Sequence, residues 1–199
     1  NNVAMPSSYA VMRMMIRSDQ VSYPWFAPAG TRRGTIDNAT RLGYLSSNSE
    51  FVSIGVREGV RDTLYENRVN PLVQTSQTGI VAFGQKTRAT APSALDRVNV
   101  ARLTAFIRLQ LDLIVRPFLF EPNDKITRDE VKGVIDSFLN DLVAKRALYD
   151  YLAVCDDSNN TPSRIDRNEL YIDVAIEPVK AVEFIYIPVR IQNTGSIAN

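Results

Sequence analysis

The sequence contains no histidine and only one cysteine, Cys155. Without histidine the chain cannot form a Ser-His or Cys-His nucleophile pair, and it lacks the commonest ligand of transition metals. A single cysteine excludes an internal disulfide. Because free cysteine is among the most buried residue types, we predict that Cys155, in the apolar run 151–155, is a buried strand residue. These absences make catalysis a less favoured function before any motif is considered.

A strong net charge and long apolar runs are also missing. The formal charge is +1, so no strong field attracts the chain to nucleic acid or to a membrane surface. No apolar run approaches the roughly 18 residues that a membrane-spanning helix needs. The composition of the 199 residues, 45% hydrophobic and 23% charged, predicts a globular protein with a substantial core. Residues 1–5 have neither signal-peptide form nor an initiator methionine, and we expect a processed chain or a fragment of a longer one.

Two strands are predicted near the C-terminus. Apolar and polar residues alternate over 169–177, and a second apolar run follows at 182–191. This pattern predicts a hairpin or two neighbouring strands of one sheet. Pro188 has no N–H to donate, so the second strand lies at an edge of the sheet or contains a bulge. An apolar edge strand needs a cover or a pairing partner.

Two long helices are predicted in the middle of the chain. The first, from Arg97 to Val115, is apolar over more than half of its circumference and is therefore central to the core. The second starts with a capping box in which the Thr127 hydroxyl and the Glu130 carboxylate bond the first helical turn, and it carries one wide apolar stripe over 131–143.

Shorter elements surround this pair. We predict helices over 7–17 and 56–68, and strands over 79–84 and 149–155. The apolar stripe of the first short helix is expected to be Val11, Met12, Met15 and Ile16. Together these elements predict an α+β fold, with a small mixed or antiparallel sheet packed against two or three helices.

The segment 23–30 is predicted to be an ordered loop. Two prolines and a glycine prevent a regular helix over 23–30, and we expect Trp25 to pin the loop to the core. The pair Arg32-Arg33 that follows is compatible with an anion site. A solvated basic turn is the favoured interpretation.

Acidic residues keep one enzymatic alternative open, a domain that uses carboxylates or Mg²⁺. These residues are Asp156, Asp157 and Asp166. The segment 156–162 resembles the opening of a calcium loop, but Thr161 replaces the sixth-position glycine and Arg167 replaces the twelfth-position acid. We therefore favour a solvated turn. A strongly raised carboxyl pKa inside a pocket would support the enzyme, and the sequence has no phosphate-loop, dinucleotide or zinc motif.

Several short segments occur in an order that points to one family. They are WFAPAG at 25–30, NP at 70–71, FGQKT at 83–87, DRVNVARL at 96–103, FEPN at 120–123, NTP at 160–162 and IDRNEL at 165–170. Taken together across nearly the whole chain, they resemble the C-terminal core region of tail sheath proteins from contractile-tailed (myovirus-type) bacteriophages. We therefore expect residues 1–199 to be a single sheath core domain from a longer subunit, with 185–199 as a C-terminal arm.

This resemblance implies a structural protein without enzymatic activity and without cofactors. Tail sheath subunits stack as hexameric rings into a helical tube around the tail tube. A baseplate signal triggers contraction, which drives the tail tube through the host envelope for genome ejection. The implied partners are other copies of the chain and the tail tube, baseplate and tail terminator proteins, with no nucleic acid and no membrane insertion. The implied location is the virion tail, after assembly of this late protein in the host cytoplasm.

The resemblance also implies which residues meet neighbouring proteins. Sheath subunits exchange strands through extended arms, so the apolar face of the last strand is expected at a subunit interface. Its residues are Ile185, Ile187, Val189 and Ile191. Lys145 and Arg146 are expected to face the tail tube, although their position at the end of a helix explains them equally well. The isolated chain is expected to be monomeric, and the sheath of a bacterial tailocin or secretion system remains an alternative.

Overall fold

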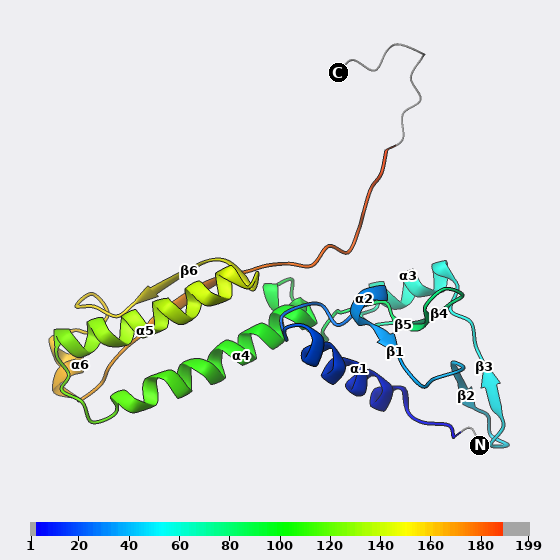
Figure 1. Ribbon diagram of the computed structural model, residues 1–199, viewed down its shortest axis with the longest axis horizontal. Helices are drawn as coiled ribbons and strands as arrows, with labels where there is room; N and C mark the ends of the chain where they lie inside the picture. The colour runs from blue at the N-terminus through cyan, green and yellow to red at the C-terminus, as the bar shows by residue number, and fades with distance from the viewer. Residues whose placement is uncertain (1–2, 189–199) are drawn as a thin grey trace, which may run out of the picture.

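Two lobes lie along the long axis of the computed structural model, which describes residues 3–188 (Figure 1). The first lobe contains α1 (Ser7–Val21), α2 (Gly30–Arg33), α3 (Glu58–Glu66) and the five short strands of the N-terminal half. The second lobe contains α4 (Val98–Val115), α5 (Lys125–Ala144), β6 (Leu148–Val154), α6 (Pro162–Asp166) and β7 (Asp173–Pro178). Short 3-10 turns, η1 (Ala94–Asp96) and η2 (Arg116–Phe118), flank α4. No helix in the described part of the chain combines the length and hydrophobicity needed to cross a bilayer.

The first lobe is built on two small antiparallel sheets. One has the strand order β1-β5-β4, and the other pairs β2 with β3. The strands are β1 (Thr35–Ile36), β2 (Gly43–Leu45), β3 (Phe51–Ser53), β4 (Leu72–Thr75) and β5 (Gly79–Ala82). The predicted strand over 79–84 is confirmed as β5, whose buried residues Ile80 and Ala82 share a core with Met14 of α1.

The predicted apolar stripe of α1 is partly wrong. Met12 and Ile16 are exposed, whereas Met14 is buried against β1 and β5 and Ser18 is buried on the same helix. Val11 and Met15 flank the buried face and are partly covered. The sequence offers apolar residues on both faces of this helix, so periodicity alone does not decide which face packs inward.

The second lobe holds the larger core, between two antiparallel helices and a two-stranded sheet. Val131, Ile135, Leu139 and Leu142 of α5 are fully buried, and Leu103 and Ile107 of α4 face them. β6 pairs antiparallel with β7, with Tyr151 opposite Ile176, and a register shift lies between Leu148 and Asp150. The two long helices, the strand at 149–155 and the α+β class are thereby confirmed. The strands form three small antiparallel sheets instead of the expected single one.

The start of α5 corrects the predicted capping box. Asp124 is the N-cap, and its carboxylate accepts a hydrogen bond from the Thr127 backbone N–H at 2.9 Å. This bond holds the pKa of Asp124 below its usual value. The helix therefore begins at Lys125, before the Thr127–Glu130 pair, because aspartate at this position satisfies the same free N–H groups one turn earlier.

The predicted second C-terminal strand is also corrected. β7 pairs with β6, and residues 179–188 contain neither helix nor strand. The segment 178–181 has no glycine, asparagine or aspartate to form a tight turn, so the chain continues outward instead of folding back as a hairpin. Ile185 and Ile187 lie on this outgoing segment (Figure 1), and Val189 and Ile191 lie outside the described residues.

Candidate assembly site at the junction of the lobes

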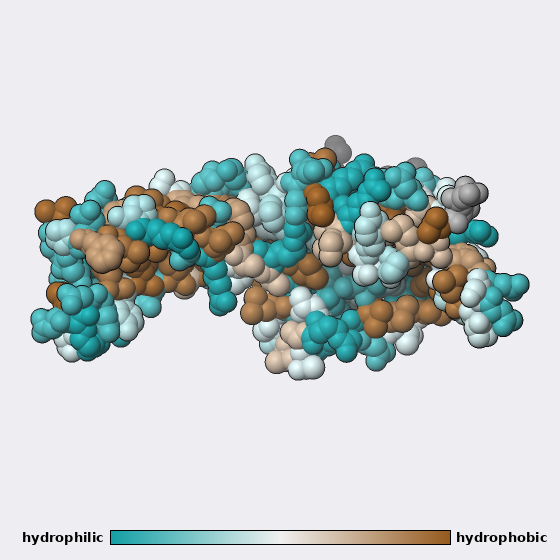
Figure 2. Space-filling model, turned by 90° about the horizontal axis from the view of Figure 1, so that it is seen from below, coloured by the Kyte–Doolittle hydropathy of each residue, from teal (hydrophilic) through white to brown (hydrophobic). Residues whose placement is uncertain are grey.

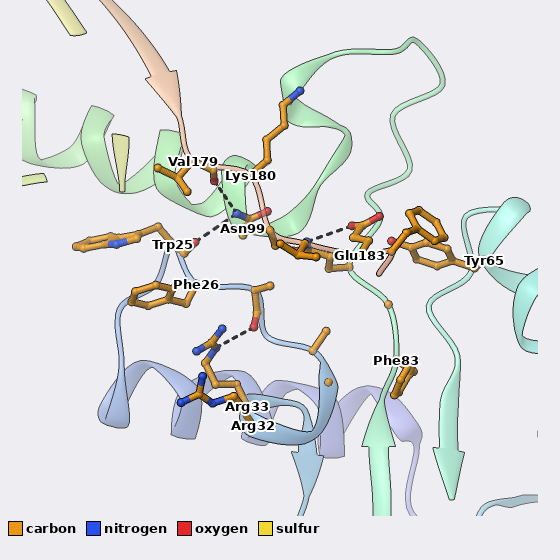
Figure 3. Close-up of a pocket in the computed structure, with 18 of the residues that line it drawn as sticks. Trp25, Phe26, Arg32, Arg33, Tyr65, Phe83, Asn99, Val179, Lys180 and Glu183 are labelled. Carbon is orange, nitrogen blue, oxygen red and sulfur yellow. Dashed lines mark hydrogen bonds between the residues drawn. The ribbon is translucent and has the colours of Figure 1, made fainter. Parts of the chain in front are cut away.

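Trp25 pins its loop to the larger core, as predicted, and in doing so it connects the two lobes. Its indole is buried, and its Nε1–H donates to the Lys145 carbonyl at the end of α5, at 3.1 Å. One face stacks on Tyr23 with a centroid distance of 4.6 Å. The Asn99 side-chain amide reaches the carbonyls of both Trp25 and Val179, at 3.4 Å each (Figure 3). Three segments that are distant in sequence therefore meet at the start of α4.

An ion pair anchors the outgoing C-terminal segment at the junction, to the residue that precedes α4. The Glu183 carboxylate accepts from Arg97 Nε at 2.6 Å and from Arg97 Nη2 at 3.0 Å, in the two-pronged geometry that favours arginine. The Gln85 amide donates to the same carboxylate at 3.2 Å. Tyr65 lies beside this pair (Figure 3). The segment is thus held at Glu183 and leaves the fold immediately afterwards.

Tyr65 should report on this anchor in a pH titration. Burial, and then the charge and hydrogen bond of Glu183, raise its pKa from 10.0 to about 12. We expect Glu183→Gln to lower the pKa of Tyr65, while burial keeps it above 10.0, as measured by NMR of ring-labelled tyrosine. Because the neutral phenol is favoured in the folded chain, its stabilising contribution is complete below pH 10 and is lost as the pH rises through about 12. Tyr65→Phe, in which this titration is absent, assigns the signal, and an unchanged Tyr65 pKa in the glutamine variant would contradict the contact.

Beyond Glu183 the chain exposes large apolar side chains. Ile185 and Ile187 are each 77% exposed, Tyr186 is 89% exposed, and Phe184 is exposed beside them. Such side chains are normally buried against something. The structure therefore places the two described members of the predicted interface set on an uncovered, extended segment.

A cavity of about 650 Å³ opens at the junction, between the Trp25 loop, α2 and the outgoing segment 179–184 (Figure 3). Arg32 and Arg33 line one side, and Glu183 with Tyr65 lines the other. Arg146, one of the two residues expected to face the tail tube, also borders this cavity. The arginine pair that the sequence suggested as a solvated turn is therefore part of a concave surface.

Lys145, the other residue expected to face the tail tube, lies at the end of α5. Its ammonium group pairs with Asp141 at 2.6 Å, one helical turn earlier. Its backbone carbonyl accepts the Trp25 bond. The helix-end explanation of Lys145 therefore accounts for its contacts within the chain.

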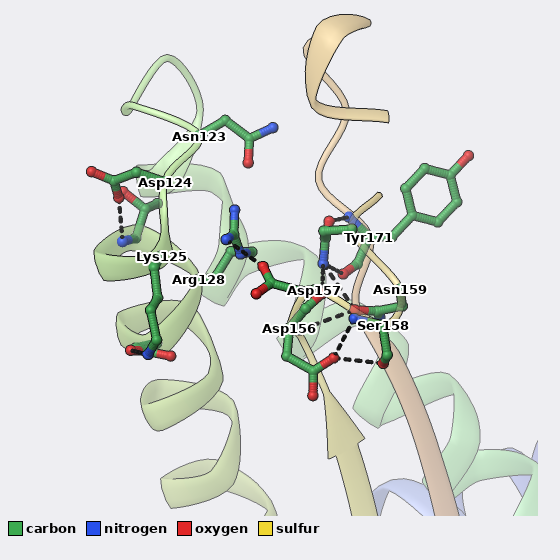
Figure 4. A network of polar contacts seen from close by, with 12 residues as sticks. Asn123, Asp124, Lys125, Arg128, Asp156, Asp157, Ser158, Asn159 and Tyr171 are labelled. Atoms are coloured by element: carbon green, nitrogen blue, oxygen red, sulfur yellow. Dashed lines mark hydrogen bonds and ion pairs between the residues drawn. The ribbon is translucent and has the colours of Figure 1, made fainter. Parts of the chain in front are cut away.

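The acidic turn after β6 is a hydrogen-bonded structural turn (Figure 4). Asp156 accepts from the Ser158 N–H at 2.8 Å, and the Ser158 contacts hold the pKa of Asp156 below its usual value instead of raising it. The buried Asn160 amide bonds Tyr171 through both backbone groups, and Asp157 pairs with Arg128 at 2.9 Å. Within residues 3–188, no cluster of three or more potential ligands is arranged to hold a metal ion. The predicted solvated turn is confirmed for the exposed residues 156–158 and is wrong for Asn159 and Asn160, which are buried.

The surface of the second lobe carries further exposed apolar residues. Figure 2, which views the molecule from below, shows apolar side chains gathered over this lobe. Leu109 and Leu113 of α4 are exposed, as are Leu119 and Phe120 in the following loop. Contiguous apolar surface of this kind marks contact with other macromolecules. The exposed features of the molecule thus suit assembly better than chemistry.

These features define the class of the molecule, an elongated α+β module with uncovered surfaces for contact with other chains. A family model described as the phage tail sheath C-terminal domain matches residues 90–192, and the chain belongs to this family.

Curated relatives agree with this assignment. The chain is 38% identical over 168 residues to the tail sheath protein of Vibrio phage KVP40, a match that covers 84% of this chain and 24% of the relative. It is 33% identical over 192 residues to the tail sheath protein of Enterobacteria phage T4, covering 96% of this chain and 28% of the relative. The chain therefore spans about a quarter of the length of these relatives.

Solved structures share the fold. The chain resembles a subunit in the anti-feeding prophage baseplate, with a TM-score of 0.80, 22% identity, and coverage of 96% of this chain and 51% of that one. It also resembles a subunit of the contracted PVC sheath complex of an extracellular contractile injection system, with a TM-score of 0.79, 20% identity, and coverage of 97% and 52%.

Proposed function

We propose that this chain is the C-terminal core of a longer structural subunit that polymerises as a contractile phage tail sheath. The subunit stacks in hexameric rings around the tail tube, and contraction drives the tube through the host envelope for genome ejection. Family membership and the names of the curated relatives support this proposal. The subunit has a mechanical role and no catalytic one, and needs no cofactor.

The observation that carries the proposal is the exposed apolar segment that follows Glu183. Ile185 and Ile187 face solvent although each would gain about 1.5–3 kcal/mol by burial. An extended segment also leaves its backbone hydrogen-bonding groups open, and addition to the edge of a sheet satisfies both needs at once. Residues 185–199 therefore act as an arm that reaches a neighbouring subunit, with Ile185, Ile187, Val189 and Ile191 at the interface.

The β6–β7 sheet is the receiving surface for such an arm. In the described part of the chain it has two strands only, so each strand keeps one edge without a strand partner. A two-stranded sheet gains stability when a further strand is added. Backbone pairing also tolerates rotation of one subunit relative to the next, which suits an assembly that changes shape.

Phage origin is favoured over a tailocin or secretion-system sheath. The curated phage relatives are 33–38% identical, whereas the injection-system structures are 20–22% identical. The subunit accordingly belongs to the virion tail after assembly in the host cytoplasm. Its partners are other copies, the tail tube, baseplate and tail terminator proteins, and Lys145 and Arg146 remain the residues proposed to face the tube.

Negative-stain electron microscopy of the complete subunit, beside the 199-residue chain, tests the proposal. We expect hollow striated tubes from the complete subunit, with or without purified tail tube protein as a template. The 199-residue chain should give no tubes and should sediment as a monomer, because its inter-subunit strands lack partners. Absence of tubes even with the tail tube protein would contradict the sheath function, and a stable ring or dimer of the short chain would contradict the expected monomer.

A further inference from the structure

The junction cavity contains positive charge that its own walls do not neutralise. Arg61, on one side, is paired with Glu58 at 3.1 Å, and Glu183 is occupied by Arg97. Arg32, Arg33 and Arg146 line the same cavity, and within residues 3–188 none of them makes an ion pair. A concave site with unpaired guanidinium groups favours a carboxylate or another anion.

Arg33 is held in place for such a role. Its Nε–H donates to the Ala27 carbonyl at 3.2 Å, and its guanidinium lies over the Phe26 ring at 4.9 Å (Figure 3). Burial, and then the charges of Arg32 and Arg146, lower its pKa. The three guanidinium groups therefore repel one another within one site, and a bound anion would relieve this repulsion.

The size of the junction cavity narrows the kind of anion. Asn99 and Gln85 line the cavity, but their side-chain oxygens Oδ1 and Oε1 are fully buried, so the arginines supply the polar contacts that a ligand can reach. The cavity volume of about 650 Å³ is that of a pocket for a drug-sized ligand, which is larger than a single inorganic ion. The site therefore suits an acidic peptide segment.

The chain itself offers a matching segment at its opposite end. Residues 3–97 contain 11 Lys and Arg against 7 Asp and Glu, whereas residues 98–188 contain 11 against 15. Asp156 and Asp157 are adjacent in the turn after β6. Asp157 pairs with Arg128 at 2.9 Å, but its side chain is 86% exposed, so the carboxylate is open to a second guanidinium group. This turn lies at the end of the second lobe remote from the junction (Figure 1), so it cannot reach the cavity of its own molecule.

We propose that the junction cavity of one copy binds the Asp156–Asp157 turn of a second copy. The inference rests on the proposed function, because it requires copies of the chain to assemble. The aspartates of the second copy approach Arg33 and Arg146, which line the cavity without an ion-pair partner. Such a contact joins the two ends of the molecule head to tail, and repeated head-to-tail contacts give rings or helical filaments. The contact adds to the arm contacts of the complete subunit, and alone it is too weak to hold the 199-residue chain in a stable oligomer.

A labelled peptide tests this contact without requiring assembly. A fluorescein-labelled peptide of residues 153–162 is titrated with the 199-residue chain at low salt, and binding is read by anisotropy. Fluorescence of Trp25, the single tryptophan, reports whether the junction is the site, because its indole lines the cavity. We expect saturable binding, which weakens at least about tenfold when the peptide carries Asp156→Asn and Asp157→Asn.

Variants of the chain provide the matched comparison. Arg33→Gln combined with Arg146→Gln should weaken binding at least about tenfold, and Arg33→Lys, which keeps the charge, should retain part of it. Arg116→Gln removes an exposed arginine elsewhere on the second lobe and should leave binding unchanged. Thermal melts of all variants establish that the cavity variants are folded.

Three results would overturn the inference: no binding by the acidic peptide, equal binding by the asparagine peptide, or tighter binding of phosphate or an oligonucleotide than of the acidic peptide. Failure of this inference can be distinguished from failure of the proposed sheath function. If the complete subunit with Arg33→Gln and Arg146→Gln still forms tubes at the wild-type concentration, the inference is wrong and the sheath function stands. If the unmodified subunit forms no tubes, the sheath function is wrong whatever the peptide does.

Discussion

Replacing Ile185 and Ile187 with lysine in the complete subunit is expected to abolish tube formation, while leaving the folded subunit unchanged. Both side chains are uncovered in the single chain, so the substitutions remove no packing within it. In the assembly, each buried isoleucine contributes about 1.5–3 kcal/mol, so losing both weakens every arm contact by roughly 10²–10⁴-fold. The measurement is the lowest subunit concentration that gives sedimentable tubes, with electron microscopy of the pellets.

The matched control replaces the same two residues with valine, which keeps an apolar, strand-forming side chain at both positions. This variant should assemble within about tenfold of the wild-type concentration. Thermal melts of the monomeric form should coincide for all three proteins. Tubes from the lysine variant at the wild-type concentration would show that the arm is not a required contact.

Leu139→Ala should lower the stability of the subunit more than any surface substitution. Leu139 of α5 is 0% exposed and lies in the core that joins α4, α5 and the β6–β7 sheet. Truncating a buried leucine removes transfer free energy and leaves a cavity, at a cost of about 2–5 kcal/mol. For a chain of this size each kcal/mol lowers the melting temperature by about 2–4 °C, so calorimetry should record a decrease of about 5–15 °C.

Leu109→Ala is the matched control for this prediction. Leu109 lies on α4 and is 58% exposed, so the same truncation creates no cavity. Its effect on the melting temperature should be close to the experimental error in the monomeric chain. A similar decrease for the two variants would mean that the second lobe does not unfold around the core that contains Leu139.

The elements that the sequence predicted well have a strong repeating pattern. α4 and α5 carry apolar residues at helical spacing over several turns, so one face of each is suited to burial. The alternation over 169–177 predicted β7, although the strand starts only at Asp173. Trp25 was also placed correctly, because a large aromatic between two prolines has few options other than pinning its loop. These predictions depend on neighbours within a few positions of the sequence.

The incorrect predictions concern positions where the local sequence allows two different structures. Asp124 and Thr127 are both good caps one turn apart, and the earlier residue forms the cap. α1 has apolar residues on two faces, and only the position of β1 and β5 selects Met14. The run at 182–191 has the pattern of a strand, but its described residues have no strand partner in the same chain. The pattern alone could not specify whether this run pairs with β7 as a hairpin or extends away from the fold.

The junction could not be predicted, because its contacts join segments far apart in the chain. Arg97 and Glu183 are separated by 86 positions, and Asn99 reaches Trp25 across 74. No periodicity connects such pairs. The sequence indicated that Arg32 and Arg33 are compatible with an anion site but favoured a solvated turn, and nothing in it indicated that Arg146 lies at the same cavity.

The length of α4 converts a small rotation at its first turn into a larger displacement at its far end. The helix starts at the Asn99 bonds and runs 18 residues toward the remote end of the second lobe, a length of about 27 Å (Figure 1). A tilt of about 10° at the junction would displace that end by about 5 Å, which is close to the roughly 4.8 Å spacing between paired strands. A small angular change where Trp25, Asn99 and Val179 meet would therefore move the remote end by about the distance between neighbouring strands. If copies pair through strands as proposed, the stiffness of these few bonds would set how accurately the paired strands are aligned.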